Sequence, residues 1–145
     1  RSLYAKYWRW SDAVLNYAQL NGRLQTRYGW SLHITPETKE RTIRNFPMQG
    51  NGAEMLRLAL CYITEAGITV CAPVHDAVLI EAPLAELEEV TELARGYMAL
   101  ASRQILHGLE LRTDVDYIRY PARYDDNDGS KMWKTVMQLL PKLCA

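Results

Sequence analysis

The sequence has few cysteines, a single phenylalanine, no excess of either charge and no long apolar run. Its three cysteines, Cys61, Cys71 and Cys144, are widely spaced and have no second cysteine or histidine at the separation of a zinc site. We therefore expect reduced thiols in a cytoplasmic protein. No apolar stretch approaches the roughly 20 residues that span a bilayer, and no basic-then-apolar leader opens the chain, so a membrane partner is not expected.

The 17 basic and 17 acidic side chains cancel, so composition alone gives no argument for a nucleic-acid surface. A length of 145 residues with 48% apolar residues, including four Trp and nine Tyr, suits one domain with a sizeable core over residues 1–145. The sequence begins with Arg1 rather than Met, from which we expect that upstream sequence is missing.

The residue pattern predicts helices that alternate with two hairpins. Apolar residues at helical spacing predict helices over 3–20, from Pro47 to Gly67 and from Pro83 to Gly108, with shorter helices over 37–45 and 131–140. Alternation predicts hairpins over 24–34 and 68–82 and a further strand over 111–120, followed by a turn at 125–129. This order predicts an α+β fold, an antiparallel sheet with helices packed on one face.

Three polar side chains, Arg41, Asn45 and Gln49, stand at four-residue steps in the segment RTIRNFPMQG. Such steps line one face of a helix. Arg donates hydrogen bonds, and Asn and Gln both donate and accept them, which is the repertoire for phosphates, sugars and base edges in a minor groove. Gly50 and Gly52 would let a backbone come close. The alternative is an ordinary solvated helix start, in which the proline and the glycines act as breakers.

The second polar group, His75 and Asp76, stands at the expected tip of the apolar hairpin over 68–82. A carboxylate held there by two buried strands is a fixed ligand for Mg²⁺, so Asp76 is the candidate metal ligand. Glu81 stands an odd number of residues further along and is expected on the opposite face, away from the same ion. The alternative is an ordinary turn aspartate beside a partly buried histidine.

Together these segments resemble family A DNA polymerases, the DNA polymerase I type, in which Arg-x3-Asn-x-Pro-x-Gln-Gly is followed by a Val-His-Asp hairpin. The chain matches the first segment at every defining position from Arg41 to Gly50, and VHDAVLIEAP resembles the third polymerase motif of the family. Weaker similarities extend the resemblance over nearly the whole chain, at Leu24-x-Thr26-x-x-Gly29-Trp30, Arg119 to Arg123 and Met132-Trp133.

The resemblance implies the C-terminal part of a polymerase palm. Asp76 would correspond to one of the two catalytic aspartates that hold two Mg²⁺ ions, and His75 would lie near the primer terminus. Arg41, Asn45 and Gln49 would contact the primer-template duplex along its minor groove. The implied reaction is attack of a primer 3′-hydroxyl on the α-phosphate of a deoxynucleoside triphosphate, with two ions stabilising the entering and leaving oxygens.

Two departures from the family pattern matter for activity. Ala77 follows Asp76 where many members have Glu, so any role of that carboxylate is absent here. The first polymerase motif with the other aspartate, the fingers helix and the thumb would all precede Arg1. Because one aspartate cannot build a two-metal site, we expect the chain to be inactive alone and to act with an N-terminal polymerase portion.

Two alternatives stay open, and the expected truncation adds a prediction about exposed surfaces. A non-catalytic nucleic-acid-binding or assembly module from a truncated or split polymerase would be favoured by exposed aromatic surface near Tyr4, Tyr7 and Trp8. A small metal-dependent hydrolase would use His75 and Asp76, although no cluster of further ligands accompanies them. Surfaces that the family buries against the rest of the palm would be exposed or covered by a second copy, which would give a homo-oligomer.

Overall fold

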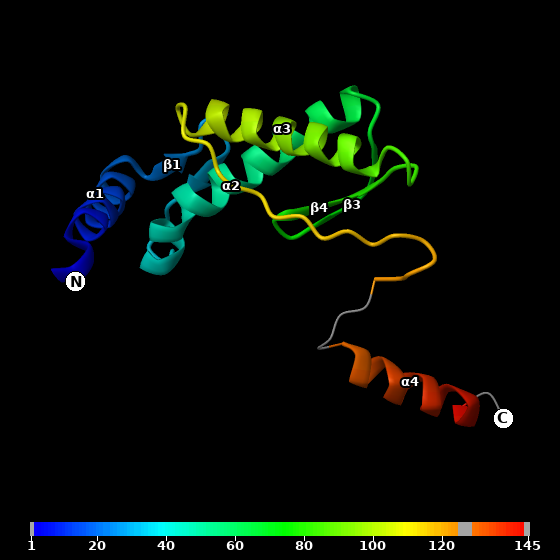
Figure 1. Cartoon of the computed structure of the whole chain (residues 1–145). Coiled ribbons are helices and arrows are strands. Elements are labelled where there is room, and N and C mark those ends of the chain that lie inside the picture. The colour runs from blue at the N-terminus through cyan, green and yellow to red at the C-terminus, as the bar shows by residue number, and fades with distance from the viewer. Residues whose placement is uncertain (1, 125–128, 144–145) are drawn as a thin grey trace. The chain divides into compact units, whose positions relative to one another are not determined.

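The computed structural model describes residues 2–124 and 129–143, in two compact units that divide between Thr113 and Asp114 (Figure 1). The first unit contains a short 3₁₀ turn, Ser2–Tyr4, and then α1 (Ala5–Asn21), β1 (Arg23–Gln25), β2 (Ser31–His33), α2 (Glu40–Glu65), β3 (Thr69–Val74), β4 (Ala77–Glu81) and α3 (Leu87–Ile105). The second contains α4 (Ser130–Leu143). The expected α+β fold is confirmed, whereas a single domain over residues 1–145 stays a prediction.

Helix α1 and the first hairpin pack on the N-terminal half of α2. Helix α1 ends at Gly22, whose φ of 69° places it in the left-handed region that glycine adopts without strain. Strand β1 then pairs antiparallel with β2, with Leu24 opposite Leu32. This arrangement buries one apolar core, formed by Leu15, Ala18, Leu24 and Ile43, with Val14, Leu32, Ile34 and Phe46 packed against it.

Helix α2 is continuous through Pro47, so the expected division into a helix over 37–45 and a second one from Pro47 is wrong. An internal proline removes one backbone hydrogen bond and disfavours the helical conformation of the preceding residue, at a cost of about 3 kcal/mol. Buried residues on both sides of it, Ile43 before and Ala59 after, hold the two halves in one helix. Tertiary packing therefore outweighs the local preference.

The second hairpin and α3 pack on the C-terminal half of α2. Figure 1 shows α3 running alongside α2, with the β3–β4 hairpin beside them. The strands pair antiparallel, with a bulge between Val70 and Ala72 and the pair Val74–Ala77 enclosing the turn. A second core fills the space between these elements, formed by Ile63, Ile68 and Ala94, with Val70, Ile80, Val90, Tyr97 and Met98 packed against it.

Two other expectations, the start of α3 and a strand over 111–120, differ from the structure. Helix α3 begins at Leu87 rather than Pro83, because the Pro83 carbonyl accepts from Glu86 N in a preceding turn. Residues 111–120 form no strand. Their side chains alternate between apolar and polar as in a strand, but no described strand pairs with this segment. The turn expected at 125–129 falls on residues 125–128, which lie outside the described part of the chain. The helix expected over 131–140 is confirmed as α4.

A buried polar network fastens the loop between β1 and β2 to α2. Glu54 is only 4% exposed, and its carboxylate accepts hydrogen bonds from Thr26 Oγ1 and from Tyr28 N, the latter at 2.9 Å. One turn earlier, Asn51 Oδ1 accepts from Arg27 N at 3.0 Å. The loop also closes on itself, because Trp30 N donates to Thr26 Oγ1 at 2.9 Å. The network places Thr26 directly against the backbone of Gly50.

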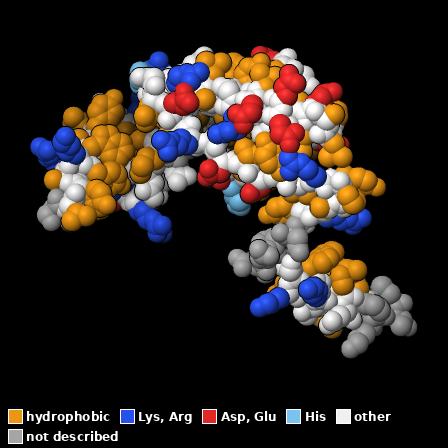
Figure 2. Space-filling model, viewed as in Figure 1, with side chains coloured by type: hydrophobic (Ala, Val, Ile, Leu, Met, Phe, Trp, Pro, Cys, Tyr) orange, Lys and Arg blue, Asp and Glu red, His pale blue; other side chains and the backbone are white. Residues whose placement is uncertain are grey.

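Charge is unevenly distributed over the surface. On the face drawn in Figure 2, acidic side chains gather over α3, whereas lysines and arginines are spread over the surface and are also present on α4. None of the helices within residues 2–124 and 129–143 combines the length and apolar character needed to cross a bilayer.

The contact between Gly50 and Thr26 leads to a stability prediction. A Cβ at position 50 would lie 2.6 Å from Thr26 Cγ2, so Gly50→Ala forces the buried loop to shift. We expect the free energy of unfolding to fall by about 1–3 kcal/mol, measured by urea denaturation.

The matched control is Gly52→Ala in the same helix, where a Cβ would meet nothing within 4 Å. Because Ala is a better helix former than Gly, the free energy of unfolding of this variant should stay unchanged or rise by up to about 1 kcal/mol. Equal losses in the two variants would contradict the packing explanation.

Candidate functional site

A cleft of about 550 Å³ opens between α2, the tip of the β3–β4 hairpin, α3 and the segment after it. Its polar lining includes Gln49 from α2, His75 and Asp76 from the hairpin tip, and Ser102 and Thr113 from the α3 side. The remaining lining is mostly apolar, namely Met48, Gly52, Ala53, Met55, Leu56, Ala59, Met98 and Leu111. The fold thus brings together residues from the two segments that the sequence singled out.

Arg41 and Asn45 are not part of the cleft lining, but they belong to the same row of α2 as Gln49. Because α2 is continuous, residues at four-residue steps lie one above the other on its surface. Arg41 is exposed near the N-terminal end of α2, and Asn45 is half-buried. The row therefore leads along α2 into the cleft.

The five predicted site residues, Arg41, Asn45, Gln49, His75 and Asp76, share one property. Among the described residues, none of their side chains makes a hydrogen bond or ion pair. Polar side chains next to them on α2 behave differently: Arg44 Nη1 donates to Ser11 Oγ and to Asp12 Oδ1, both at 2.8 Å. One set of polar residues thus stabilises the fold, while the other is available to a ligand.

The hairpin tip holds His75 in an unusual backbone conformation. The two-residue turn between Val74 and Ala77 gives His75 a φ of 56°, in the left-handed region. Glycine or asparagine would occupy this position at lower energy. Strained backbone conformations of this kind cluster at functional sites, and the strain at His75 therefore marks the hairpin tip as a candidate site.

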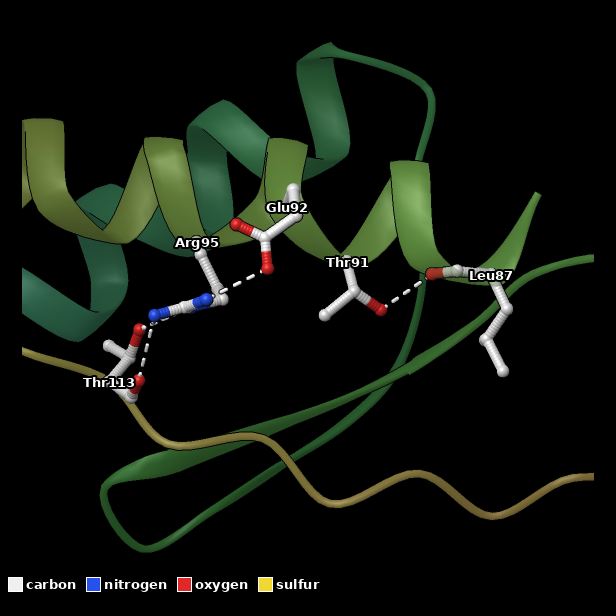
Figure 3. A network of polar contacts seen from close by, with 5 residues as sticks. All are labelled: Leu87, Thr91, Glu92, Arg95 and Thr113. Carbon is white, nitrogen blue, oxygen red and sulfur yellow. Dashed lines mark hydrogen bonds and ion pairs between the residues drawn. The ribbon is translucent and has the colours of Figure 1, made fainter.

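The far wall of the cleft is a segment fastened to α3. Figure 3 shows Arg95 reaching from α3 to Thr113, where it donates to the backbone carbonyl and to Oγ1, both at 3.3 Å, while Glu92 accepts from Arg95 at 2.8 Å. The Ser102 hydroxyl accepts from Leu111 N at 3.1 Å. These bonds fix a segment without regular secondary structure, so that Leu111 and Thr113 can line the cleft.

The metal-binding potential of the cleft is limited to one carboxylate. Asp76 is exposed at the hairpin tip, and Glu81 lies at the other end of β4, where Cys71 Sγ is 3.8 Å from its Oε2. Within the described residues, no group of three or more His, Cys, Asp or Glu side chains could hold a metal ion. Asp76 can therefore contribute one oxygen ligand to a site that needs further donors.

Sequence reasoning missed the residues that position the site. Arg95 and Ser102 hold the segment of Leu111 and Thr113 in place by hydrogen bonds. Glu54 and Asn51 do the same for the β1–β2 loop. One signal was present: Glu54 and Ser102 are polar residues within helices rich in apolar residues, and such residues are often buried with a partner. Their partners, which lie far away in sequence, could not be read from it.

No family model matches this chain. The thermostable DNA polymerase I of Thermus thermophilus is 30% identical to it over 111 residues, which are 68% of this chain and 13% of that protein. The DNA polymerase I of Deinococcus radiodurans is 29% identical over 103 residues, 62% of this chain and 11% of that protein. For the DNA polymerase I of Lactococcus lactis subsp. cremoris the identity is 31% over 100 residues, 65% of this chain and 10% of that protein.

Among solved structures, the fold is similar to the POL domain of Pol1 from M. smegmatis, a structure in complex with DNA primer-template and dNTP. The TM-score is 0.57 with 24% identity, over 64% of this chain and 19% of that one. The chain thus spans about 13% of the length of the thermostable relative from Thermus thermophilus.

The left-handed conformation of His75 leads to a second prediction. His75→Gly should raise the free energy of unfolding by about 1 kcal/mol, because glycine adopts this φ without the steric cost that a Cβ brings. Thermal denaturation of the 145-residue chain measures the change.

Asp76→Gly is the control, since Asp76 is not among the residues with positive φ. There glycine adds only freedom to the unfolded chain and should lower stability by about 0.5–1 kcal/mol. A loss of stability in His75→Gly would show that the histidine side chain itself stabilises the turn.

Proposed function

Since this chain is a relative of the family A DNA polymerases, the DNA polymerase I type, we propose that it forms the C-terminal palm segment of such an enzyme. In this proposal it carries out template-directed nucleotidyl transfer together with the other polymerase parts. Its partners are primer-template DNA, deoxynucleoside triphosphates and the polypeptide that holds the remaining active-site residues. A cytoplasmic location is part of the same proposal.

The observation that carries the proposal is the meeting of Gln49, His75 and Asp76 in one cleft, with Arg41 and Asn45 in line on α2. Asp76 offers a carboxylate oxygen to a divalent ion, and the exposed His75 beside it can donate to a phosphate or a sugar oxygen. Arg41, Asn45 and Gln49 can contact phosphates and minor-groove acceptors along a duplex that enters the cleft. Because these side chains have no polar partner among the described residues, they are available for that purpose.

Mg²⁺ fits this set of residues only in part. When bound, two ions supply charge stabilisation to the entering and leaving oxygens of phosphoryl transfer. Asp76 would hold them together with at least one carboxylate from another polypeptide segment, since Mg²⁺ in such enzymes is held by one or two carboxylates and substrate phosphates. We therefore propose that nucleotide incorporation requires the other polymerase parts and that this chain alone does not support it.

The test is primer extension with Mg²⁺ by a protein in which this chain is joined to the polymerase segments that precede it in its relatives. Asp76→Asn should lower the rate by at least about 1,000-fold, because a metal ligand supports several kcal/mol of transition-state stabilisation. The chain without those segments should not extend the primer.

Glu81→Gln serves as the matched control, because it removes a carboxylate from the same hairpin outside the cleft. Extension by this variant should stay within about twofold of the parent, in line with the small effect of surface changes. Unchanged extension by Asp76→Asn would remove Asp76 from the metal site and with it the proposed reaction.

A second candidate function, an assembly or nucleic-acid-binding module without its own activity, is favoured by the surface of α1. Several large apolar residues of this region are exposed, namely Leu3, Tyr4, Tyr7, Trp10, Tyr17 and Leu20, the last to 87%. Trp8 is half-buried, so the expected aromatic surface is present around it. Clustered apolar surface of this kind marks contact sites between proteins.

Self-association tests this second candidate. If α1 is a contact surface between copies, sedimentation analysis should give a dimer or larger species whose dissociation constant rises at least tenfold in the variant Tyr17→Glu/Leu20→Glu. Exposed positions of this kind tolerate Glu without loss of the fold, which circular dichroism checks. A monomer at all concentrations would exclude a homo-oligomer through this surface.

A further inference from the structure

A second concave surface lies on the other side of α2 from the cleft. It is a groove of about 670 Å³, and its lining includes Tyr28, Trp30, Glu54, Arg57, Leu58 and Cys61. With about 3.6 residues per turn, Glu54, Arg57 and Cys61 of α2 fall on the face opposite Met48, Gly52 and Ala59 of the cleft. We call this surface the Trp30 groove. Ala53 lines both the groove and the cleft, whereas Trp30 and Arg57 line the groove and not the cleft.

The Trp30 groove is built on a fixed loop. Thr26 N donates to the Trp30 carbonyl at 2.9 Å, and Trp30 N donates to Thr26 Oγ1 at 2.9 Å. The buried Glu54 holds both Thr26 and the backbone of Tyr28. The carboxylate of Glu54, which is the one carboxylate among the described residues that line the groove, thereby accepts its hydrogen bonds from the loop.

The aromatic rings of Tyr28 and Trp30 and the guanidinium of Arg57 are nevertheless accessible to a ligand. Tyr28 is 58% exposed and Trp30 54%, although the backbone of both is tied down. The guanidinium of Arg57 lies over the Trp30 ring, 5.5 Å from its centroid, and forms no ion pair within the part of the chain that the structure describes. The groove therefore offers flat apolar faces beside a positive charge that has no anionic partner among the described residues.

We propose that the Trp30 groove is a binding site for single-stranded nucleic acid, with a base stacked on Trp30 and a backbone phosphate on Arg57. Aromatic platforms next to cations bind single strands because every base has a flat π face and every linkage has a negative charge. An acidic peptide could form an ion pair with Arg57, but it has no flat group to stack on Tyr28 and Trp30. A nucleic acid can do both, so the two rings beside the cation favour a nucleic acid as the ligand. The proposed contact residues, Trp30 and Arg57, lie outside the cleft lining, so the proposal can be tested independently of the polymerase reaction.

The experiment is fluorescence anisotropy of a labelled oligothymidylate of about 12 nucleotides, a length within the range that single-strand sites cover, titrated with the full chain. Trp30→Leu should weaken binding about 5- to 100-fold, the effect of losing one stacked base. Trp30→Phe, which keeps a ring, should lose clearly less. Arg57→Gln should lower the slope of log affinity against log salt by about 0.7, the value for one phosphate of a single strand.

Trp133→Leu is the matched control, because Trp133 is an exposed tryptophan of α4 outside the groove lining, and it should bind like the parent. Equal affinity of Trp30→Leu and the parent would overturn the proposal. Displacement of the oligonucleotide by polyglutamate as readily as by unlabelled oligonucleotide would also overturn it, since an anionic peptide would then be the better description of the ligand.

The groove and the cleft are distinguished by measuring the variant of each site in the assay for the other. Trp30→Leu should leave primer extension by the joined polymerase unchanged, and Asp76→Asn should leave binding of the oligonucleotide unchanged. Retained oligonucleotide binding without any primer extension would overturn the polymerase proposal and support the groove. Loss of oligonucleotide binding in Asp76→Asn would place the strand in the cleft and overturn the groove.

Discussion

The continuous helix α2 is the constraint on which the rest of the first unit depends. Its 26 residues extend over about 39 Å and carry both apolar cores, one on each half. Pro47 lies between the halves, and a break there would turn the two cores relative to each other. Because the helix stays whole, the row from Arg41 to Gln49 and the tip of the β3–β4 hairpin keep a fixed relation, which is the geometry the cleft requires.

The polar residues of α2 divide between structural and functional use. Arg44, Asn51 and Glu54 bind α1 or the β1–β2 loop, and these bonds hold the surrounding elements on the helix. Gln49 and Arg57 point to two concave surfaces instead and have no polar partner among the described residues. A helix that uses some of its polar side chains for its own attachments can present the others in fixed positions, which lowers the entropy lost when a ligand binds.

Much of the fold was readable from the sequence because its signals are local. The end of α1 at Gly22, the hairpin around His75 and Asp76 and the helix α4 follow from glycine, turn residues and apolar spacing. The continuity of α2 through Pro47 was not readable, since it depends on burial contributed by distant elements. For the candidate site, the sequence indicated Gln49, His75 and Asp76 but not the wall formed by Thr113, whose position depends on Arg95.

The β3–β4 hairpin has a further consequence for the behaviour of the protein in solution. A two-stranded sheet consists only of edges, and an open edge can recruit a strand from another molecule and start aggregation. Strand β3 contains a bulge at Cys71 and has at Pro73 a residue without a backbone donor, two features that blunt an edge. Strand β4 has neither, and Leu79 on it is 49% exposed. Concentrated samples should therefore be most prone to aggregate along β4, where a lysine or proline on the outer side of the strand would protect the protein.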